Sequence, residues 1–301
     1  MIKQLKNKKP LVTVVMPVYN AGDFLVPAIE SILNQTFQNF EFIIVDDASN
    51  DGSKAVIRSY TQKYPDKIKP IFLIKNRNCG GDACVNEGFK RSVGKFVARM
   101  DADDVAHPKR LEKQVAYLRK HPEIIVLGTQ AYVINKEGAI TGEKTEPTTD
   151  KEIRKAYFVF HPMINPSVII RRSLLPSQRK LYTISYDANN DLLTFFGFLR
   201  LGKFANLSEK LLYYRIHGKN DSLINPKGRF LNTLRIRIYA VAKLGYTPTF
   251  KGVIMNIAQA LAALILPAGL ITKIYLLWRG IEKSKKEANL SLELKYAPVS
   301  S

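Results

Sequence analysis

Three aspartates stand within four residues, at Asp101, Asp103 and Asp104, directly after a short apolar run. Carboxylates this close repel one another and raise each other's pKa unless a cation neutralises them. Ligation by oxygen alone suits Mg²⁺ or Mn²⁺, which can bridge a protein to a diphosphate and stabilise its charge as it leaves. The run therefore predicts a metal site. The alternative is a solvated turn with a helix cap ahead of Pro108.

A second acidic cluster begins at Asp46 and Asp47 and continues to Gly52. Taken alone, such residues form ordinary turns and helix caps. This cluster also follows an apolar run, so both clusters are expected at strand ends. Two such ends in one parallel sheet can approach a common ligand, one through base or ribose donors and the other through the metal and phosphates.

The first hundred residues alternate between apolar, β-branched runs and amphipathic segments. Strands are expected at residues 11–16, 42–45, 71–74 and 96–100, and helices at 25–33, 53–64 and 81–92. This order predicts an α/β fold with a mostly parallel central sheet flanked by helices, whose ligands lie at the carboxyl ends of the strands. Both acidic clusters fall at that edge.

Beyond Lys120 the alternation is less regular. Short strands are expected at residues 124–128, 132–135, 167–171 and 211–216, and a helix at 191–201. We expect a catalytic domain over residues 1–225, with its boundary near Asn225 and Pro226. Residues 226–301 are expected to form a C-terminal helical appendage.

The charge is unusual: 46 Lys and Arg face 26 Asp and Glu among 301 residues, a net charge of +20. Such an excess implies an anionic partner: nucleic acid, lipid headgroups or phosphorylated substrates. It is concentrated late in the chain, because no carboxylate occurs between Asp221 and Glu282. Two cysteines are too few for a disulfide framework, which favours a reduced, cytosolic compartment.

Residues 252–278 are strongly apolar, but four residues interrupt the run: Asn256, Gln259, Pro267 and Lys273. The uninterrupted part is shorter than the ~20 residues of a membrane-spanning helix. Two helices broken at the proline and lying on an anionic membrane surface are expected, which would make the protein peripheral on the cytosolic face of the membrane. A helical appendage packed on the catalytic domain is the alternative.

Four ordered motifs resemble those of the family 2 glycosyltransferases of the GT-A fold. They occupy residues 13–20, 31–36, 45–49 and 100–104, and the similarity continues through 110–114 and 212–217. The resemblance covers about residues 11–222. It implies inverting transfer of a hexosyl or related group from a nucleoside diphosphate sugar, with a UDP-sugar as the first expectation.

The resemblance also implies roles for particular residues. The donor's nucleotide and sugar are expected near Pro17, Tyr19, Asp47, Asp82 and Asp101. A divalent ion, Mn²⁺ or Mg²⁺, is expected at Asp101, Asp103 and His217. For Asp82 and His217, roles in capping a helix or a loop are the alternatives.

The chain departs from the family pattern in two places. Asn189 occupies the position expected for the catalytic base, and an amide cannot accept the proton usefully. Asp191 or Asp187 then becomes the base, unless the register is shifted or the enzyme is impaired. The second departure is Val85, where relatives often carry an arginine that contacts the donor.

Three functions compete. The first is a metal-dependent glycosyltransferase of bacterial surface polysaccharide synthesis, acting on a glycan or polyprenyl-linked acceptor. The segment 161–167 carries no charge suited to an ionised acceptor, which favours a neutral sugar hydroxyl. The second is a nucleotide-sugar-binding protein that has lost turnover, suggested by Asn189 and Val85. The third is a nucleic-acid-binding protein, which explains neither acidic cluster, so no nucleic-acid partner is expected.

Overall fold

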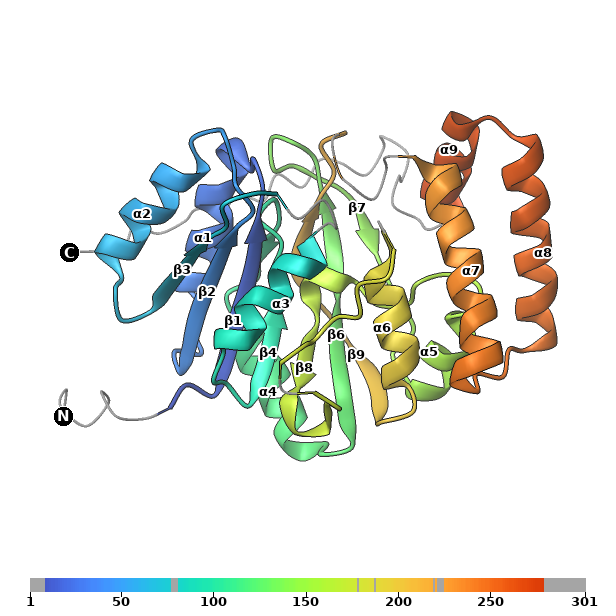
Figure 1. Cartoon of the computed structure of the whole chain (residues 1–301), viewed down its shortest axis with the longest axis horizontal. Coiled ribbons are helices and arrows are strands. Elements are labelled where there is room, and N and C mark those ends of the chain that lie inside the picture. Colours follow the sequence, from blue (N-terminus) through green and yellow to red (C-terminus); the bar gives the residue numbers. More distant parts are fainter. Residues whose placement is uncertain are drawn as a thin grey trace.

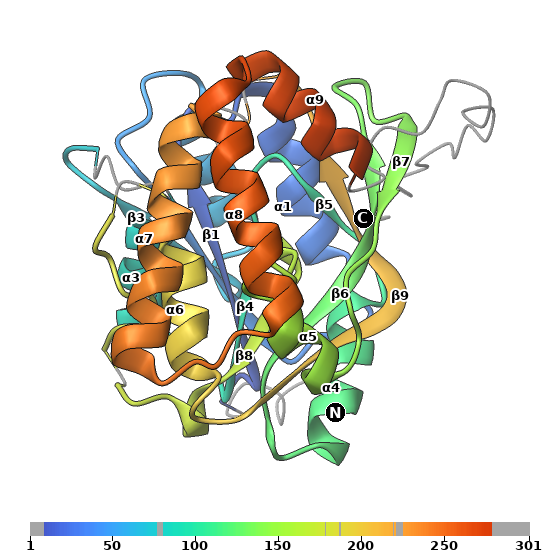
Figure 2. The same ribbon diagram turned by 90° about the vertical axis from the view of Figure 1, so that its right-hand side faces the viewer.

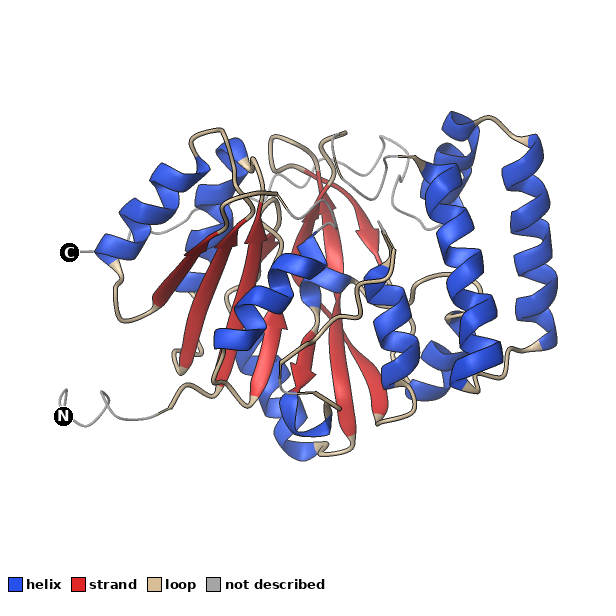
Figure 3. Ribbon diagram, in the orientation of Figure 1, coloured by secondary structure: helices blue, strands red, loops and turns tan. Residues whose placement is uncertain are grey.

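The computed structural model describes residues 9–76, 81–177, 179–186, 188–218, 220 and 225–278. Within them, nine strands form one curled sheet with helices on both faces (Figures 1 and 3). The strands are β1 (Val12–Val18), β2 (Phe40–Asp46), β3 (Ile68–Phe72), β4 (Phe96–Arg99), β5 (Val105–Ala106), β6 (Ile124–Ile134), β7 (Ile140–Lys144), β8 (Ile169–Arg171) and β9 (Lys203–Arg215).

The helices alternate with the first strands and then gather at the C-terminal end. They are α1 (Leu25–Leu33), α2 (Ser53–Lys63), α3 (Gly81–Arg91), α4 (Arg110–Lys120), α5 (Asp150–Ala156), α6 (Asn190–Phe198), α7 (Pro226–Leu244), α8 (Phe250–Ile265) and α9 (Ala268–Trp278). Three 3₁₀ turns accompany them, at Gly22–Phe24, Asn165–Ser167 and Arg172–Leu174.

The sheet has a parallel half and a mixed half. Its order is β3-β2-β1-β4-β8-β6-β9-β5, with β7 paired to β6. The strands β3, β2, β1 and β4 are all parallel, as the βαβ alternation predicts. In the other half β8 runs antiparallel to both β4 and β6, β5 antiparallel to β9 and β7 antiparallel to β6, while β6 and β9 are parallel. The α/β fold and its helical C-terminal region are therefore confirmed.

Side chains of β1 alternate between two hydrophobic cores, one on each face of the sheet. Val12, Val14 and Met16 join the core covered by α1, α2 and α4. Val15 joins the core covered by α3, α6 and α7. Because both faces are covered, β1, β2 and β4 are mostly apolar instead of alternating regularly with polar residues.

Several element bounds differ from the sequence prediction. The expected strands at 124–128 and 132–135 are one continuous strand, β6, because buried Thr129 and Gln130 bridge them. The strand β9 begins at Lys203, eight residues before the expected start, and β3 covers Ile68–Phe72 where 71–74 was expected.

The C-terminal helices pack beside α6, at one end of the sheet (Figures 1 and 2). Ile236 and Ala240 of α7 are fully buried in the same core as Phe195 of α6. The break expected at Pro267 separates α8 from α9. Among the helices of the described ranges, not one is both long and apolar enough to cross a membrane.

Candidate active site

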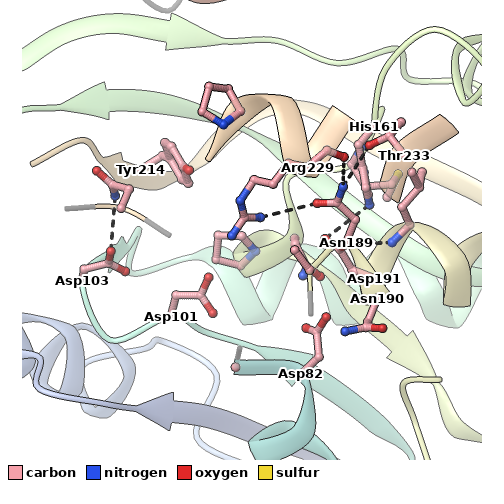
Figure 4. Close-up of a pocket in the computed structure, with 18 of the residues that line it drawn as sticks. Asp82, Asp101, Asp103, His161, Asn189, Asn190, Asp191, Tyr214, Arg229 and Thr233 are labelled. Carbon is pink, nitrogen blue, oxygen red and sulfur yellow. Dashed lines mark hydrogen bonds and ion pairs between the residues drawn. The ribbon is translucent and has the colours of Figure 1, made fainter. Parts of the chain in front are cut away.

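A cleft of about 1440 Å³ opens at the carboxyl ends of the parallel strands (Figure 4). It receives side chains from the ends of β1, β2 and β4, the start of α3 and the start of α6, and α7, α8 and α9 form its far wall. Eight predicted site residues line it: Pro17, Tyr19, Asp47, Asp82, Asp101, Asp103, Asp191 and His217. The remaining one, Asp187, lies outside the described residues.

The two aspartates at the end of β2 take different places. Asp46 is fully buried, and its Oδ2 accepts a hydrogen bond from the Ser49 backbone N–H at 3.2 Å. Asp47 lines the cleft, and its backbone N–H donates to the carbonyl of Val18 at 2.8 Å. The first aspartate therefore shapes the loop after β2, and the second is the one that a ligand in the cleft can reach.

The loops after β1 and β2 are joined by polar contacts. The Asn20 backbone N–H donates to Ser49 Oγ at 3.0 Å, and the Asn50 N–H donates to Asn20 Oδ1 at 2.9 Å. Asn20 and Ala48 both have left-handed backbones, with φ values of 49° and 60°. Such a conformation is costly for alanine and persists only where its surroundings enforce it. These contacts hold Asp47 beside Pro17 and Tyr19.

The acidic loop after β4 divides its three carboxylates between structure and cleft. Asp104 is buried, and its Oδ1 accepts a hydrogen bond from the Arg215 backbone N–H at 2.8 Å. Burial, together with Asp103 and Asp101, raises the pKa of Asp104 well above its ordinary value. Asp101 and Asp103 line the cleft. Asp104 therefore ties the loop to β9 while its neighbours face the open space.

Asp103 and His217 lie together, as the sequence predicted for two members of a metal site. Asp103 Oδ2 is 3.1 Å from His217 Nε2 and 3.5 Å from Asn220 Nδ2. The imidazole of His217 packs 4.9 Å from the ring of Phe24. The chain thus brings the end of β9 back to the loop after β4, although more than a hundred residues separate them.

The pair has suitable donor atoms for a divalent cation in company with a diphosphate. No group of three or more His, Cys, Asp or Glu residues is placed to hold a metal anywhere in the described part of the chain. Mg²⁺ at nucleotide sites, however, typically takes one or two carboxylates and completes its shell with phosphates and water. Asp103 would supply one such carboxylate beside the imidazole of His217, and Asp101 is a second carboxylate in the same cleft.

Arg99, which the sequence analysis overlooked, connects two of the predicted donor residues. Its Nε donates to Asp101 Oδ1 at 2.9 Å, and its Nη1 pairs with Asp82 Oδ1. Burial raises the pKa of the Asp82 carboxyl to about 6, against the lowering effect of Arg99. Burial likewise raises the pKa of Asp101, and Arg99 again opposes the shift. The positive charge of Arg99 therefore offsets the repulsion between the carboxylates of Asp82 and Asp101 in the cleft wall.

The position of Val85 clarifies the second departure from the family pattern. Val85 is fully buried in the core beneath α3 and does not line the cleft. Arg99 instead contributes a guanidinium to the cleft wall, from β4. The loss of an arginine at position 85 thus does not leave this wall without a cation.

The three residues at the start of α6 have three different environments. Asn189 has a left-handed backbone, φ 63°, and its Nδ2 donates at 2.9 Å to both the Arg229 carbonyl and Thr233 Oγ1 of α7. Asn190 is buried, and its Oδ1 accepts backbone N–H groups of Ser185 and Tyr186, both at 3.0 Å. Both amides are therefore occupied by structure.

Asp191 presents a carboxylate to the cleft. Its Oδ1 accepts the Leu192 backbone N–H at 2.8 Å, and its Oδ2 lies 3.4 Å from His161 Nε2. Figure 4 shows it in the same cleft as Asp82 and Asp101, and its negative charge contributes to the raised pKa of both. The residue expected to be the base is therefore an acid that lines the same cleft as Asp82 and Asp101.

His161 is a second residue that the sequence analysis missed. The Met163 backbone N–H donates to His161 Nδ1 at 3.3 Å, so Nδ1 is the acceptor of the ring and Nε2 carries the hydrogen in the neutral form. Nε2 lies 3.4 Å from Asp191 Oδ2. The segment 161–167 was expected to face the acceptor without charge, yet it brings this imidazole to the carboxylate.

A comparison with known proteins supports the expected family. The family model described as Glycosyl transferase family 2 matches residues 13–177. An uncharacterized glycosyltransferase of Methanocaldococcus jannaschii is 37% identical over 232 residues, which cover 73% of this chain and 75% of that protein. TuaG of Bacillus subtilis, whose name assigns it to teichuronic acid biosynthesis, is 36% identical over 114 residues, covering 38% of this chain and 44% of its own.

Solved structures with the same fold include two with bound nucleotide sugars. TarS from S. aureus, in complex with UDP-GlcNAc, has a TM-score of 0.61 at 20% identity, covering 77% of this chain and 66% of that one. The mannosyltransferase PcManGT from Pyrobaculum calidifontis, in complex with GDP-Man and Mn²⁺, has a TM-score of 0.56 at 17% identity, covering 91% and 81%. At these identities the likeness concerns the fold.

Proposed function

Because this chain belongs to glycosyl transferase family 2 and has a fold of the GT-A type, we propose that it is an inverting, metal-dependent enzyme with Asp191 as its base. It transfers a sugar from a nucleoside diphosphate sugar to a hydroxyl group of a glycan or lipid-linked acceptor. The observation that carries the proposal is the placement of Asp191 in the same cleft as Asp82, Asp101 and Asp103.

Asp191 is suited to remove the proton from the acceptor. In a single displacement, the acceptor hydroxyl loses its proton to a base, and its oxygen forms a bond to the anomeric carbon. The bond between that carbon and the diphosphate oxygen breaks, and the diphosphate departs with the electron pair. The Leu192 N–H donates to Oδ1, and the imidazole Nε2 of His161 lies 3.4 Å from Oδ2, so a polar group borders each oxygen.

The donor lies along the opposite wall in this proposal. Pro17, Tyr19 and Asp47 contact the nucleoside, while Asp82 and Asp101, fixed by Arg99, border the sugar. Asp103 and His217 would hold Mn²⁺ or Mg²⁺ near the diphosphate, and the positive charge of that ion would stabilise the leaving group.

A UDP-sugar is the donor we propose, and a polyprenyl-linked glycan the acceptor. TarS was solved with UDP-GlcNAc, which supports a UDP-sugar as the donor. PcManGT was solved with GDP-Man, so the donor screen includes GDP-sugars as well. The similarity to TuaG supports a role in surface polysaccharide synthesis. The far wall of the cleft supports the lipid, because it includes Met255, Leu266 and Ile271. We propose that the reaction takes place at the cytosolic face of the membrane.

The direct test measures release of nucleoside diphosphate from a panel of UDP- and GDP-sugars, with and without Mn²⁺ and a glycolipid acceptor. We expect transfer from one UDP-sugar, with inversion at the anomeric carbon visible by NMR. Chelation with EDTA should abolish transfer, and added Mn²⁺ should restore it. Asp103→Ala should lower the rate at fixed metal concentration, with Glu209→Ala, an exposed carboxylate outside the cleft, as its control.

Two outcomes would contradict the proposal. Full turnover of Asp103→Ala in EDTA would remove the metal role. Binding of a nucleoside diphosphate with no transfer to any acceptor would favour a binding protein without turnover. The hydrogen bonds of Asn189 to α7 already give that residue a structural explanation, so the amide at position 189 is not by itself a sign of lost activity.

A further inference from the structure

The outer face of α8 is a continuous apolar stripe that the described part of the protein leaves uncovered. Six large side chains recur along it at steps of three and four residues, which places them on one side of a helix. They are Phe250 (82% exposed), Ile254 (50%), Ile257 (56%), Leu261 (53%), Leu264 (77%) and Ile265 (77%). Figure 1 shows α8 at the edge of the molecule, farther from the sheet than α7.

The two uncharged polar side chains in the middle of α8, Asn256 and Gln259, point the opposite way, into the protein. Asn256 is buried and donates to the carbonyl of Phe158 at 3.0 Å. Gln259 donates to the carbonyl of Val159 at 3.0 Å and accepts from buried Arg237 at 3.2 Å. A helix on the surface of a water-soluble domain has the reverse pattern, with apolar residues inward. The orientation of α8 therefore suits an apolar environment on its outer side.

Charge distinguishes between the possible occupants of this face. The described helices α7 to α9 carry no carboxylate, and their exposed cations include Lys227, Arg235, Lys243, Lys251 and Lys273. A second copy of the same helices would bring like charges together and add no anion to compensate them. A bilayer with anionic headgroups offers both an apolar layer for the stripe and negative charge for the cations.

We propose that the outer face of α8, formed by these six residues, docks on a bilayer containing anionic lipids. At 16 residues α8 is too short to span the ~30 Å hydrocarbon layer. It lies along the interface, with the stripe among the upper acyl chains and the exposed lysines at the headgroups.

The position of α8 connects this surface to the cleft. Its inner side contributes Met255, Ala262 and Ala263 to the cleft wall, Leu266 follows directly after α8, and α9 contributes Ile271. Docking through the outer side therefore brings the acceptor side of the cleft close to the membrane, where a lipid-linked acceptor resides. The docking of α8 on the bilayer is independent of the proposed function. Its role in bringing the cleft to a lipid-linked acceptor rests on that function.

The test is vesicle flotation of the full chain with phosphatidylcholine vesicles, with and without phosphatidylglycerol. We expect the protein to float with the anionic vesicles and to be released by high salt, since screening weakens the attraction of the lysines. The double variant Ile257→Glu/Leu261→Glu should bind at least about tenfold more weakly, because two carboxylates replace side chains that enter the apolar layer. Lys251→Glu should weaken binding to the vesicles that contain phosphatidylglycerol and should not change binding to vesicles without it.

The matched control is Ile74→Glu, the same change at a fully exposed apolar residue two positions after β3, a strand that lies on the other side of the molecule from α8 (Figure 1). It should float like the unmodified protein. Melting temperatures and UDP binding establish that all variants are folded. The proposal is overturned if the double variant floats like the control, or if the unmodified protein ignores vesicles and dimerises through α8, as light scattering would reveal. Neither outcome depends on sugar transfer.

Discussion

Residues 189 to 191 illustrate how neighbouring side chains of similar size take different tasks. The amide of Asn189 binds α7, the amide of Asn190 shapes the turn before α6, and Asp191 is left to face the cleft. An amide both donates and accepts hydrogen bonds, whereas a carboxylate only accepts them. The two asparagines are therefore placed where donation is needed, and the aspartate lines the cleft, where the proposed function requires a group that accepts a proton.

We predict that Asn189→Asp destabilises the fold without raising the transfer rate. Aspartate also tolerates the left-handed backbone, but its carboxylate cannot donate to the Arg229 carbonyl, which would then face a negative charge. The expected loss is about 1–3 kcal/mol of unfolding free energy, measured by urea denaturation. A gain in kcat would instead identify position 189 as an impaired base site.

We predict that His161→Asn lowers kcat while the KM for the donor nucleotide sugar stays unchanged. Asp191→Asn should lose the full contribution of the base, roughly 10²–10⁴-fold in kcat. His161→Asn should lose part of it, because the carboxylate remains but one of its oxygens loses its partner. Steady-state kinetics check both. If both variants instead lose kcat/KM equally because the KM for the donor rises, His161 and Asp191 act in donor binding.

At the scale of elements, the turn between α3 and β4 depends on a close approach to β1. A Cβ atom on Gly94 would lie 2.5 Å from the Thr13 backbone nitrogen and 2.8 Å from the Val12 carbonyl carbon. The Gly94 N–H also donates to Thr13 Oγ1 at 2.9 Å. Since these are backbone contacts of a central strand, they cannot yield by a change of rotamer.

We therefore predict that Gly94→Ala costs about 1–3 kcal/mol of unfolding free energy, measured by urea denaturation. Because β4 carries the acidic loop, UDP binding should weaken as well. The matched control is Gly52→Ala, where a Cβ atom would meet nothing within 4 Å and where φ is −72°. Its effect should stay within about 0.5 kcal/mol. Equal stability of the two variants would contradict the contact argument.

Local patterns predicted the parallel half of the sheet well and the mixed half less well. Buried parallel strands read as unbroken apolar runs, so β1, β2 and β4 were found close to their bounds. The strand β6 was divided in two because Thr129 and Gln130 are polar. Both are buried, and Gln130 pairs with the backbone of Glu146. Hydrogen bonds between a polar side chain and a distant segment of the chain leave no local pattern in the sequence.

The same distinction applies to the site. Acidic residues at strand ends are visible in a sequence, because topology alone brings them to one edge. Arg99 also left a readable signal: an arginine inside an apolar strand needs a buried acid, and Asp101 is on the same face two residues later. By contrast, the contact of Asn189 with Thr233 spans 44 residues and two helices, so no local pattern contains it.

For the whole molecule, ligand binding should stabilise the fold. We predict that UDP with Mn²⁺ raises the melting temperature more than UDP alone, because Asp103 and His217 would bind the ion in the folded protein. At a ligand concentration of 100 times Kd the gain is about 2.7 kcal/mol, measured by calorimetry. In Asp103→Ala the extra effect of Mn²⁺ should disappear. If Mn²⁺ raises the melting temperature of this variant equally, Asp103 does not bind the metal.

The hydrogen bonds between Asn189 and α7 have a consequence for any attempt to isolate a minimal enzyme. Stopping translation after residue 225 would follow the boundary suggested by composition. It would also strip Ile236 and Ala240 from the core and leave the amide of Asn189 without its partners, two positions before Asp191. The shortened polypeptide would thus lose the contacts that hold the segment just before Asp191, so a fragment ending at residue 225 is a poor choice for testing the proposed base.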